Sequence, residues 1–232
     1  DDNNAMTDAQ WDQLHNGEYQ DVLAAFEYAI AHGNAQVAGR TGVALRIMDM
    51  RRGVVSGIRP RMHACFDLLP QASGIDAAHL WSVVTPSDQI AIDAIPRLES
   101  ARRRLAAWRE QDSAHSLYGA LCTYADELAR AGEFEQAHRT LDEARALQQP
   151  DWPTRLVMMV PQHRGAVAMY AKDAVGYRAS RREVLRLAEQ SGATRIANSA
   201  RLGLGDAALL AEDYEEAVTL NPNFAEARMN LA

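Results

Sequence analysis

The residue types that carry most enzyme chemistry are present in this chain, but they are not grouped at catalytic or metal-binding spacings. No glycine-rich phosphate loop, Gly-x-Ser-x-Gly elbow or His-Glu-x-x-His zinc motif occurs. The histidines are scattered, and none stands four residues from another histidine or a cysteine. We therefore expect no catalytic residue, no metal site and no cofactor, and predict that the protein is not an enzyme. The histidines are His15, His32, His63, His79, His115, His138 and His163.

Charged residues form clusters that helix geometry explains better than catalysis does. A carboxylate group near the C-terminus surrounds a predicted turn and helix start, where the helix dipole favours negative charge. Two arginine groups each fall on one predicted helix, and we interpret them as solvated outer faces. The alternative is a docking surface for an acidic partner or nucleic acid. The carboxylates are Asp206, Glu212, Asp213, Glu215 and Glu216; the arginines are Arg97, Arg102, Arg103, Arg104 and Arg109, then Arg178, Arg181, Arg182 and Arg186.

Three further features are typical of a packed interior. Cys65 and Cys122 occur in unrelated contexts, as buried thiols in a reducing compartment do. Gly203 and Gly205 lack the rest of a dinucleotide loop, so we interpret them as a close helix contact. A methionine group favours core filling over an adaptable binding surface. It comprises Met158, Met159 and Met169, with Tyr170 beside them.

The composition favours helices. The chain has 232 residues, 47% hydrophobic and 24% charged, and alanine, leucine, arginine and glutamate dominate it. A net charge of −7 argues against a nucleic-acid-binding domain, because a phosphate backbone requires a basic face. Lys172 is the only lysine beside many arginines, a bias typical of a GC-rich bacterial genome.

The sequence carries no evident membrane or export signal. No stretch approaches the ~18 apolar residues of a membrane span, and the N-terminus lacks the apolar core of a signal peptide. We predict a cytoplasmic location. Residues 1–6 are expected to be a disordered tail or a cloning remnant, with Met6 as the native start behind five added residues.

Short polar turns recur at a nearly constant interval. Phe134, Ala174 and Tyr214 follow three of these turns and lie 40 residues apart, while Gly17 and Gly53 lie 36 apart. Apolar residues on both sides of each turn repeat with a helical period. We therefore predict an all-α, right-handed superhelical solenoid of about six antiparallel helix pairs, in one domain over residues 7–232. The repeats are expected near 7–33, 34–72, 73–112, 113–150, 151–191 and 192–220, with a partial unit at 221–232.

Prolines interrupt some of the expected helices. Thr85-Pro86-Ser87 divides the first helix of the third repeat. Pro60 and Pro161 fall inside predicted helices, where each should remove a hydrogen bond and kink the helix. The predicted helices include 8–16, 18–32, 35–51, 54–69, 76–84, 87–94, 96–111, 152–171, 174–190 and 193–211.

The hairpin around Gly132 carries a pattern of small and large residues that lets two helices pack closely. This pattern resembles the tetratricopeptide repeat, and the first and sixth hairpins match it in part. The matching residues are Leu121, Tyr124, Ala125, Leu128, Gly132, Glu133, Phe134, Ala137, Leu141, Ala144 and Pro150.

The fifth hairpin departs from the pattern. Gly165 keeps the small position, but Tyr177 and Arg181 stand where alanine and a large apolar residue are expected. The repeat length near 40 exceeds the usual length of about 34 residues. It is similar to the repeats in C-terminal sensor domains of maltose-regulator-type bacterial transcriptional activators and in related signal-transduction ATPases.

The last hairpin contains a conflict. Asn221-Pro222 begins a strong inter-repeat signature, yet Tyr214 should open a helix of about 14 residues. Only Glu215–Leu220 stand between them, so about two helical turns are missing. We predict an anomaly between Tyr214 and Asn221.

In tetratricopeptide proteins the first helices of the pairs line a concave groove that binds an extended peptide or a partner helix. The resemblance therefore implies a non-enzymatic protein- or peptide-binding scaffold in bacterial signalling or regulation, and leaves a homo-oligomer open. The alternative is a domain that senses a small-molecule effector within a transcriptional regulator or signal-transduction ATPase. The groove candidates from helical phase are Arg40, Val43, Ile47, Gly119, Cys122, Asp126, Ala129, Arg130, Gln162, Ala166, Met169, Ser199, Leu202 and Asp206.

Overall fold

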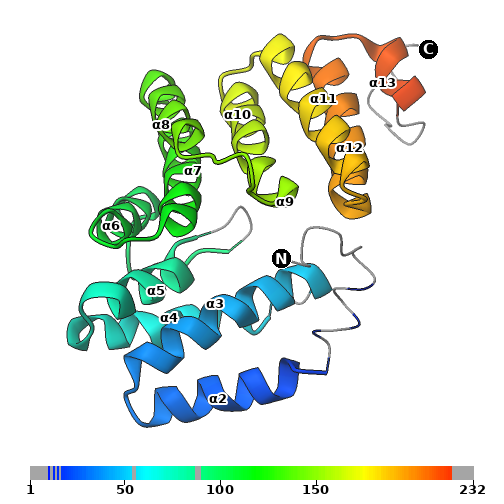
Figure 1. The fold of residues 1–232 in the computed structure, drawn as a ribbon. Coiled ribbons are helices and arrows are strands. Elements are labelled where there is room, and N and C mark those ends of the chain that lie inside the picture. The colour runs from blue at the N-terminus through cyan, green and yellow to red at the C-terminus, as the bar shows by residue number, and fades with distance from the viewer. Residues whose placement is uncertain are drawn as a thin grey trace. The chain divides into compact units, whose positions relative to one another are not determined.

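The computed structural model describes residues 10, 13, 15, 17–53, 56–86 and 90–220. Over these residues the secondary structure is helical and contains no β-strand (Figure 1). The contacts divide the chain into two compact units, with the boundary between Ala120 and Leu121 inside helix α7 (Ala114–Arg130). We call them the N-terminal unit and the C-terminal unit and describe each by itself. The expected all-α class is confirmed, whereas the six-pair superhelix stays a prediction.

The N-terminal unit packs its helices around α3 and α5. Two glycines of α3 allow this approach: a Cβ on Gly39 would lie 2.8 Å from the Cβ of His79, and one on Gly42 would lie 2.9 Å from Cγ2 of Val83. Helices α2 and α3 form an antiparallel hairpin (Figure 1). The helices of this unit are α2 (Tyr19–Ala31), α3 (Ala35–Arg52), α4 (Ile58–Leu68), the short 3-10 helix η2 (Leu69–Gln71), α5 (Gly74–Val84) and α6 (Arg97–Arg109).

A half-buried arginine closes the end of α5. Arg46 donates to the carbonyl oxygens of Ser82 (2.9 Å), Val83 (3.1 Å) and Thr85 (2.5 Å). The last carbonyl groups of a helix have no intrahelical donor, so a neighbouring side chain stabilises the helix by supplying one. Burial, with a smaller contribution from the charge of Arg97, lowers the pKa of Arg46 to about 10.

The segment after α5 corrects one helix prediction. Helix α5 ends at Val84, as the Thr85-Pro86 interruption predicts. The helix predicted at 87–94 is wrong over its described part, because residues 90–94 are not helical. Ile90 and Ile92 alternate with other residues and are buried in the core. Their burial favours an extended backbone over a helix, because side chains two residues apart share one face only in an extended chain.

The kink predicted at Pro60 is also wrong. Helix α4 begins at Ile58, later than expected, so Pro60 falls in its first turn. Backbone N–H groups in a first turn have no intrahelical acceptor, and proline therefore removes no hydrogen bond there.

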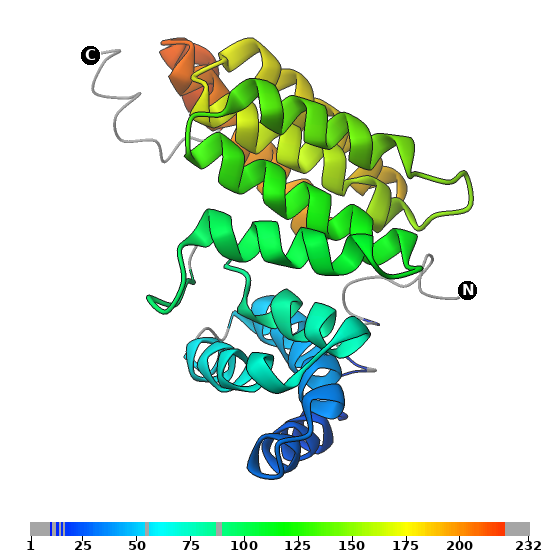
Figure 2. The ribbon, with the colours of Figure 1, turned by 90° about the vertical axis from the view of Figure 1, so that its left-hand side faces the viewer.

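The C-terminal unit is a row of helices that pack in chain order. Helix α10 contacts α8 and α11, α11 contacts α12, and α12 contacts α13. They lie side by side in the green to orange part of Figure 2. Hairpins therefore occur at the predicted turns near residues 132, 172 and 212. The helices that follow α7 are α8 (Phe134–Ala146), α9 (Thr154–Val157), α10 (Met159–Tyr170), α11 (Ala174–Gln190), α12 (Thr194–Leu210) and α13 (Tyr214–Leu220).

One hydrogen-bond pattern recurs at these turns. Gly132 has a φ of 83°, its N–H donates to the Ala129 carbonyl (3.0 Å), and the Glu133 N–H donates to the Leu128 carbonyl (2.9 Å). This is the Schellman motif, which ends a helix with one left-handed residue. The same two bonds recur around Gly33, Lys172, Gly192 and Glu212, whose φ values are 63°, 58°, 66° and 58°. The regular spacing therefore reflects a repeated helix stop.

Some predictions fall at the margins of the described chain. The helix expected at 8–16 is described only at residues 10, 13 and 15, which are helical. The anomaly predicted between Tyr214 and Asn221 falls mostly on α13, which is described as a helix of seven residues from Tyr214 to Leu220. The end of that helix at Asn221 and the partial unit at 221–232 lie outside the described residues. Among the described helices, none combines the length and apolar character that crossing a membrane requires.

Candidate functional site

The structure separates the predicted groove residues into exposed and buried positions. Gly119, Cys122 and Ala129 are buried and offer no surface to a ligand, which corrects their assignment. Cys122 and Ala129 stand four and eleven residues after the fully buried Tyr118, so at 3.6 residues per turn they fall on the same packed face of α7. The helical phase assigned to the groove is therefore in error there. The exposed positions are Arg40, Ile47, Arg130, Met169, Ser199, Leu202 and Asp206; the half-buried ones are Val43, Asp126, Gln162 and Ala166.

The least expected arrangement lies where α11 meets α10 and α12. The guanidinium of Arg181 stacks on the ring of Tyr177, with its carbon 4.9 Å from the ring centroid. A Cβ on Gly203 of α12 would lie 2.6 Å from Nε of Arg181 and 3.1 Å from the Tyr177 hydroxyl oxygen. A Cβ on Gly165 of α10 would lie 3.6 Å from Cδ2 of Tyr177. Gly203 thus makes room for two large side chains, whereas Gly165 meets them at ordinary contact distances, and we call these four residues the arginine wedge.

Arg181 interacts electrostatically with Asp206 but forms no hydrogen bond or ion pair with it. Its Nε atom is buried and lacks a hydrogen-bond acceptor, and its side chain forms no ion pair with a described residue. Arg178 on the same helix, by contrast, pairs with Glu216 at 2.6 Å. Leaving a buried donor unsatisfied costs about 1–3 kcal/mol, so the native fold tolerates the wedge at a loss of stability.

Comparison with the preceding hairpin shows what the wedge replaces. Ala137 and Leu141 stand 40 residues before Tyr177 and Arg181, and both are fully buried in the core. An alanine and a leucine at these places supply packing alone. The tyrosine and arginine of the fifth hairpin instead bring a cation to the boundary of the packed interior.

Asp206 adds a carboxylate near the wedge. It follows Gly203 by three residues on α12 and is exposed. Partial desolvation raises the pKa of Asp206, and the positive charge of Arg181 opposes this rise. Exposed apolar side chains flank both glycines, because Met169 follows Gly165 by four residues and Leu202 immediately precedes Gly203. Their exposed fractions are 41% and 54%.

A second polar group links α7 and α10. Nδ1 of His163 lies 2.7 Å from Oδ2 of Asp126, while Oδ1 of Asp126 is buried without a hydrogen-bond partner in the described chain. Arg130 lies over the ring of Tyr170, 4.9 Å from its centroid. Among the described residues, no group of three histidine, cysteine or acidic side chains is placed to hold a metal ion.

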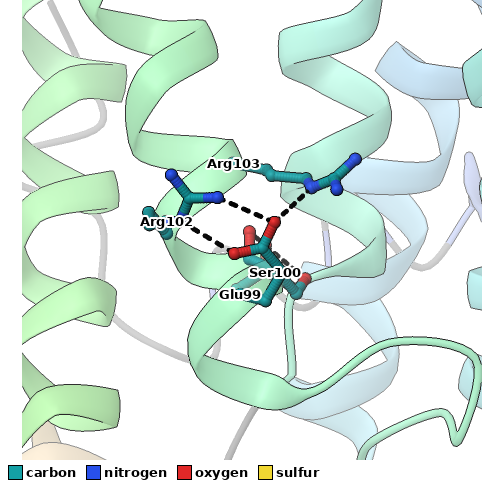
Figure 3. Close-up of polar contacts among 5 residues, drawn as sticks. Glu99, Ser100, Arg102 and Arg103 are labelled. Carbon is teal, nitrogen blue, oxygen red and sulfur yellow. Dashed lines mark hydrogen bonds and ion pairs between the residues drawn. The ribbon is translucent and has the colours of Figure 1, made fainter.

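Two arginines of the group on α6 in the N-terminal unit share one glutamate. Arg102 donates to both oxygens of Glu99 (2.8 and 2.9 Å), and Arg103 donates to one of them (2.6 Å), as Figure 3 shows. Hydrogen bonds from Arg102 and then Arg103 lower the pKa of Glu99 to about 2. Both arginine side chains are more than half exposed. The interpretation of a solvated face with glutamate neighbours is therefore confirmed for these two residues.

Sequence reasoning missed Arg181 and Tyr177 as site residues. It identified both as departures from the packing pattern, but placed them on a second helix, away from the expected groove. One signal could have identified Arg181 and Tyr177. They occupy repeat positions where a small or apolar residue is expected, and they are neither. No family model matches the chain, and no curated protein matches it.

Proposed function

We propose that this chain is a non-enzymatic scaffold of tetratricopeptide-like helix pairs whose C-terminal unit binds an acidic segment of a partner protein. The arginine wedge carries the proposal, because Arg181 is held by Tyr177 and Gly203 while its buried Nε atom lacks a hydrogen-bond acceptor in the described chain. A carboxylate from a partner would supply the missing acceptor. A charge-assisted hydrogen bond of this kind is about twice as strong as a neutral one.

The surroundings of the wedge favour a peptide segment. Met169 and Leu202 expose apolar surface on the two helices that flank Arg181, and methionine adapts to partners of varied shape. An extended segment with an acidic residue next to an apolar one would therefore bind the cation and cover these side chains together. The negative charge of Asp206 would disfavour a second acidic residue beside the first.

Peptide selection tests the proposal without a known partner. Random dodecapeptides are selected on the whole chain and counter-selected on Arg181→Met. We expect the retained peptides to carry aspartate or glutamate beside an apolar residue. Their affinity should fall at least tenfold in Arg181→Met, because a hydrogen bond to a charged group contributes about 1.5–3 kcal/mol.

Two glycine variants separate the position of Arg181 from its charge. Gly203→Ala places a methyl group 2.6 Å from Nε of Arg181 and should displace the guanidinium, so peptide affinity falls although every charge remains. Gly165→Ala is the matched control, because its nearest contact would be an ordinary 3.4 Å to Cβ of Ser180. Enriched peptides without acidic residues, or equal affinity in all three proteins, would refute the proposal.

A further inference from the structure

We propose that a pocket at the break between α9 and α10 binds a small organic anion, a carboxylate or phosphate that carries a short apolar tail. The pocket has a volume of about 130 Å³ and lies within the C-terminal unit. It shares no lining residue with the arginine wedge, and the inference is independent of the peptide-binding proposal. Its lining residues are Arg145, Gln148, Val157, Val160, Pro161, Arg164, Glu183, Arg186 and Leu187.

The pocket follows from a proline. The helix predicted at 152–171 is divided at Met158, as expected for an interruption by Pro161. Pro161 has no N–H, so the carbonyl of Val157 loses the donor that a continuous helix would give it. The side-chain amide of Gln148 reaches this carbonyl instead, at 3.3 Å. The pocket thus lies beside the Val157 carbonyl, which a continuous helix would have bonded internally. Residues of α8 and α11 form the other walls of the pocket.

The rim of the pocket is positively charged. It carries three arginines and one carboxylate, that of Glu183. Arg164 is partly neutralised by Asp142 (2.7 Å), and Arg186 donates to the neutral amide of Gln190 (3.0 Å). The side chain of Arg145 forms no hydrogen bond or ion pair with another described residue. In a chain with a net charge of −7, this local excess of positive charge favours an anion.

The floor of the pocket is apolar and sets the size of the ligand. Val157, Val160, Pro161 and Leu187 line it. An apolar cavity of about 150 Å³ accommodates the six carbons of benzene, so a pocket of about 130 Å³ takes roughly five non-hydrogen atoms, which leaves the head-group oxygens among the arginines. A planar guanidinium matches the geometry of a carboxylate or a phosphate. Inorganic anions would leave the floor uncovered.

Calorimetric titration of the full chain tests the inference, with sodium pentanoate as the probe and with pentanol and acetate as controls. We expect pentanoate to bind at one saturable site and acetate to bind more weakly, by about fourfold for each methylene removed. Pentanol, which has the tail but no charge, should show no binding. Butyl phosphate is titrated in parallel, and the tighter ligand identifies the head group. Absence of saturable binding by both anions, or equal binding of pentanol, overturns the proposal.

Charge variants connect binding to this pocket. Arg145→Gln should weaken pentanoate about tenfold, because it removes a charged donor. Arg182→Gln removes the same charge from an exposed position outside the pocket and should leave affinity unchanged. Glu183→Gln should tighten binding, an outcome that a misfolded variant cannot imitate. Equal weakening in Arg145→Gln and Arg182→Gln, or weaker binding in Glu183→Gln, would place the anion elsewhere and reject the pocket.

Discussion

Replacing Arg181 by methionine should stabilise the fold while it abolishes acidic-peptide binding. The buried Nε atom of Arg181 has no acceptor, and this omission costs about 1–3 kcal/mol. The stacking on Tyr177 that would be lost contributes about 0.5–1 kcal/mol. Methionine has a similar length, is unbranched and can occupy the room beside Gly203. The difference predicts a net gain of about 1 kcal/mol in the free energy of unfolding.

Urea denaturation followed by circular dichroism at neutral pH measures this gain, with the slope of the transition compared between variants. Arg178→Met is the matched control. It removes an arginine from the same helix, but one that is ion-paired with Glu216, and it should leave stability unchanged or lower it. If Arg181→Met loses about 1 kcal/mol or more, the arginine stabilises the native fold and the inference that it is held for a ligand fails.

Three other perturbations test separate parts of the structure. Lys172→Gly should raise the free energy of unfolding by about 1 kcal/mol in urea melts, because Lys172 has a positive φ; Gly192→Ala should lower it by a similar amount. Asp206→Asn should stabilise the protein at neutral pH but not below about pH 3.9. The folded-state pKa of Asp206 is raised, so its favourable contribution is complete below the unfolded pKa and is lost as the pH rises through the folded value. Melts at both pH values check this. Arg46→Met should destabilise the N-terminal unit by about 2–3 kcal/mol in thermal or urea unfolding, because three carbonyl groups at the end of α5 lose their donor.

Local signals explain which helices could be predicted from the sequence. Helix α11 spans Ala174–Gln190, as its periodicity predicts, because it has an apolar stripe and is bounded by two Schellman turns. A helix stop needs only a few neighbouring residues, so its position is readable in sequence. The segment at 90–94 fails for the opposite reason. Ile90 and Ile92 are buried by contacts with distant parts of the N-terminal unit, and those contacts override a helical pattern.

The candidate site depends on contacts that sequence spacing does not give. Tyr177 and Arg181 are visibly unusual for their repeat positions, yet the sequence does not show that Gly165 and Gly203 receive them. In sequence, a helix glycine that accommodates a large side chain looks the same as one that lets two helices pack closely, as Gly39 does against α5. The residue type indicates only that something approaches closely. The identity of the neighbour requires the relative rotation of three helices.

Both proposed sites are centred on the fifth hairpin, with contributions from its two neighbours, and this coincidence has a physical reason. The preceding hairpin buries Ala137 and Leu141 at the repeat positions and thereby supplies regular packing. The fifth hairpin can then tolerate a proline break and an unsatisfied arginine, since local violations of this kind persist where neighbouring elements stabilise them.

Shared location does not imply shared function. The two proposals predict that a variant in one site weakens binding of that site's ligand alone. Arg181→Met should abolish peptide binding and leave the pentanoate affinity unchanged, whereas Arg145→Gln should weaken pentanoate and leave the selected peptides unaffected. The reason is that the two groups of residues have no member in common. Titration of each ligand in the presence of the other completes the test. A change in either affinity, which linkage would make reciprocal, would show that α10 and α11 couple the sites and that the two proposals describe one regulated interaction.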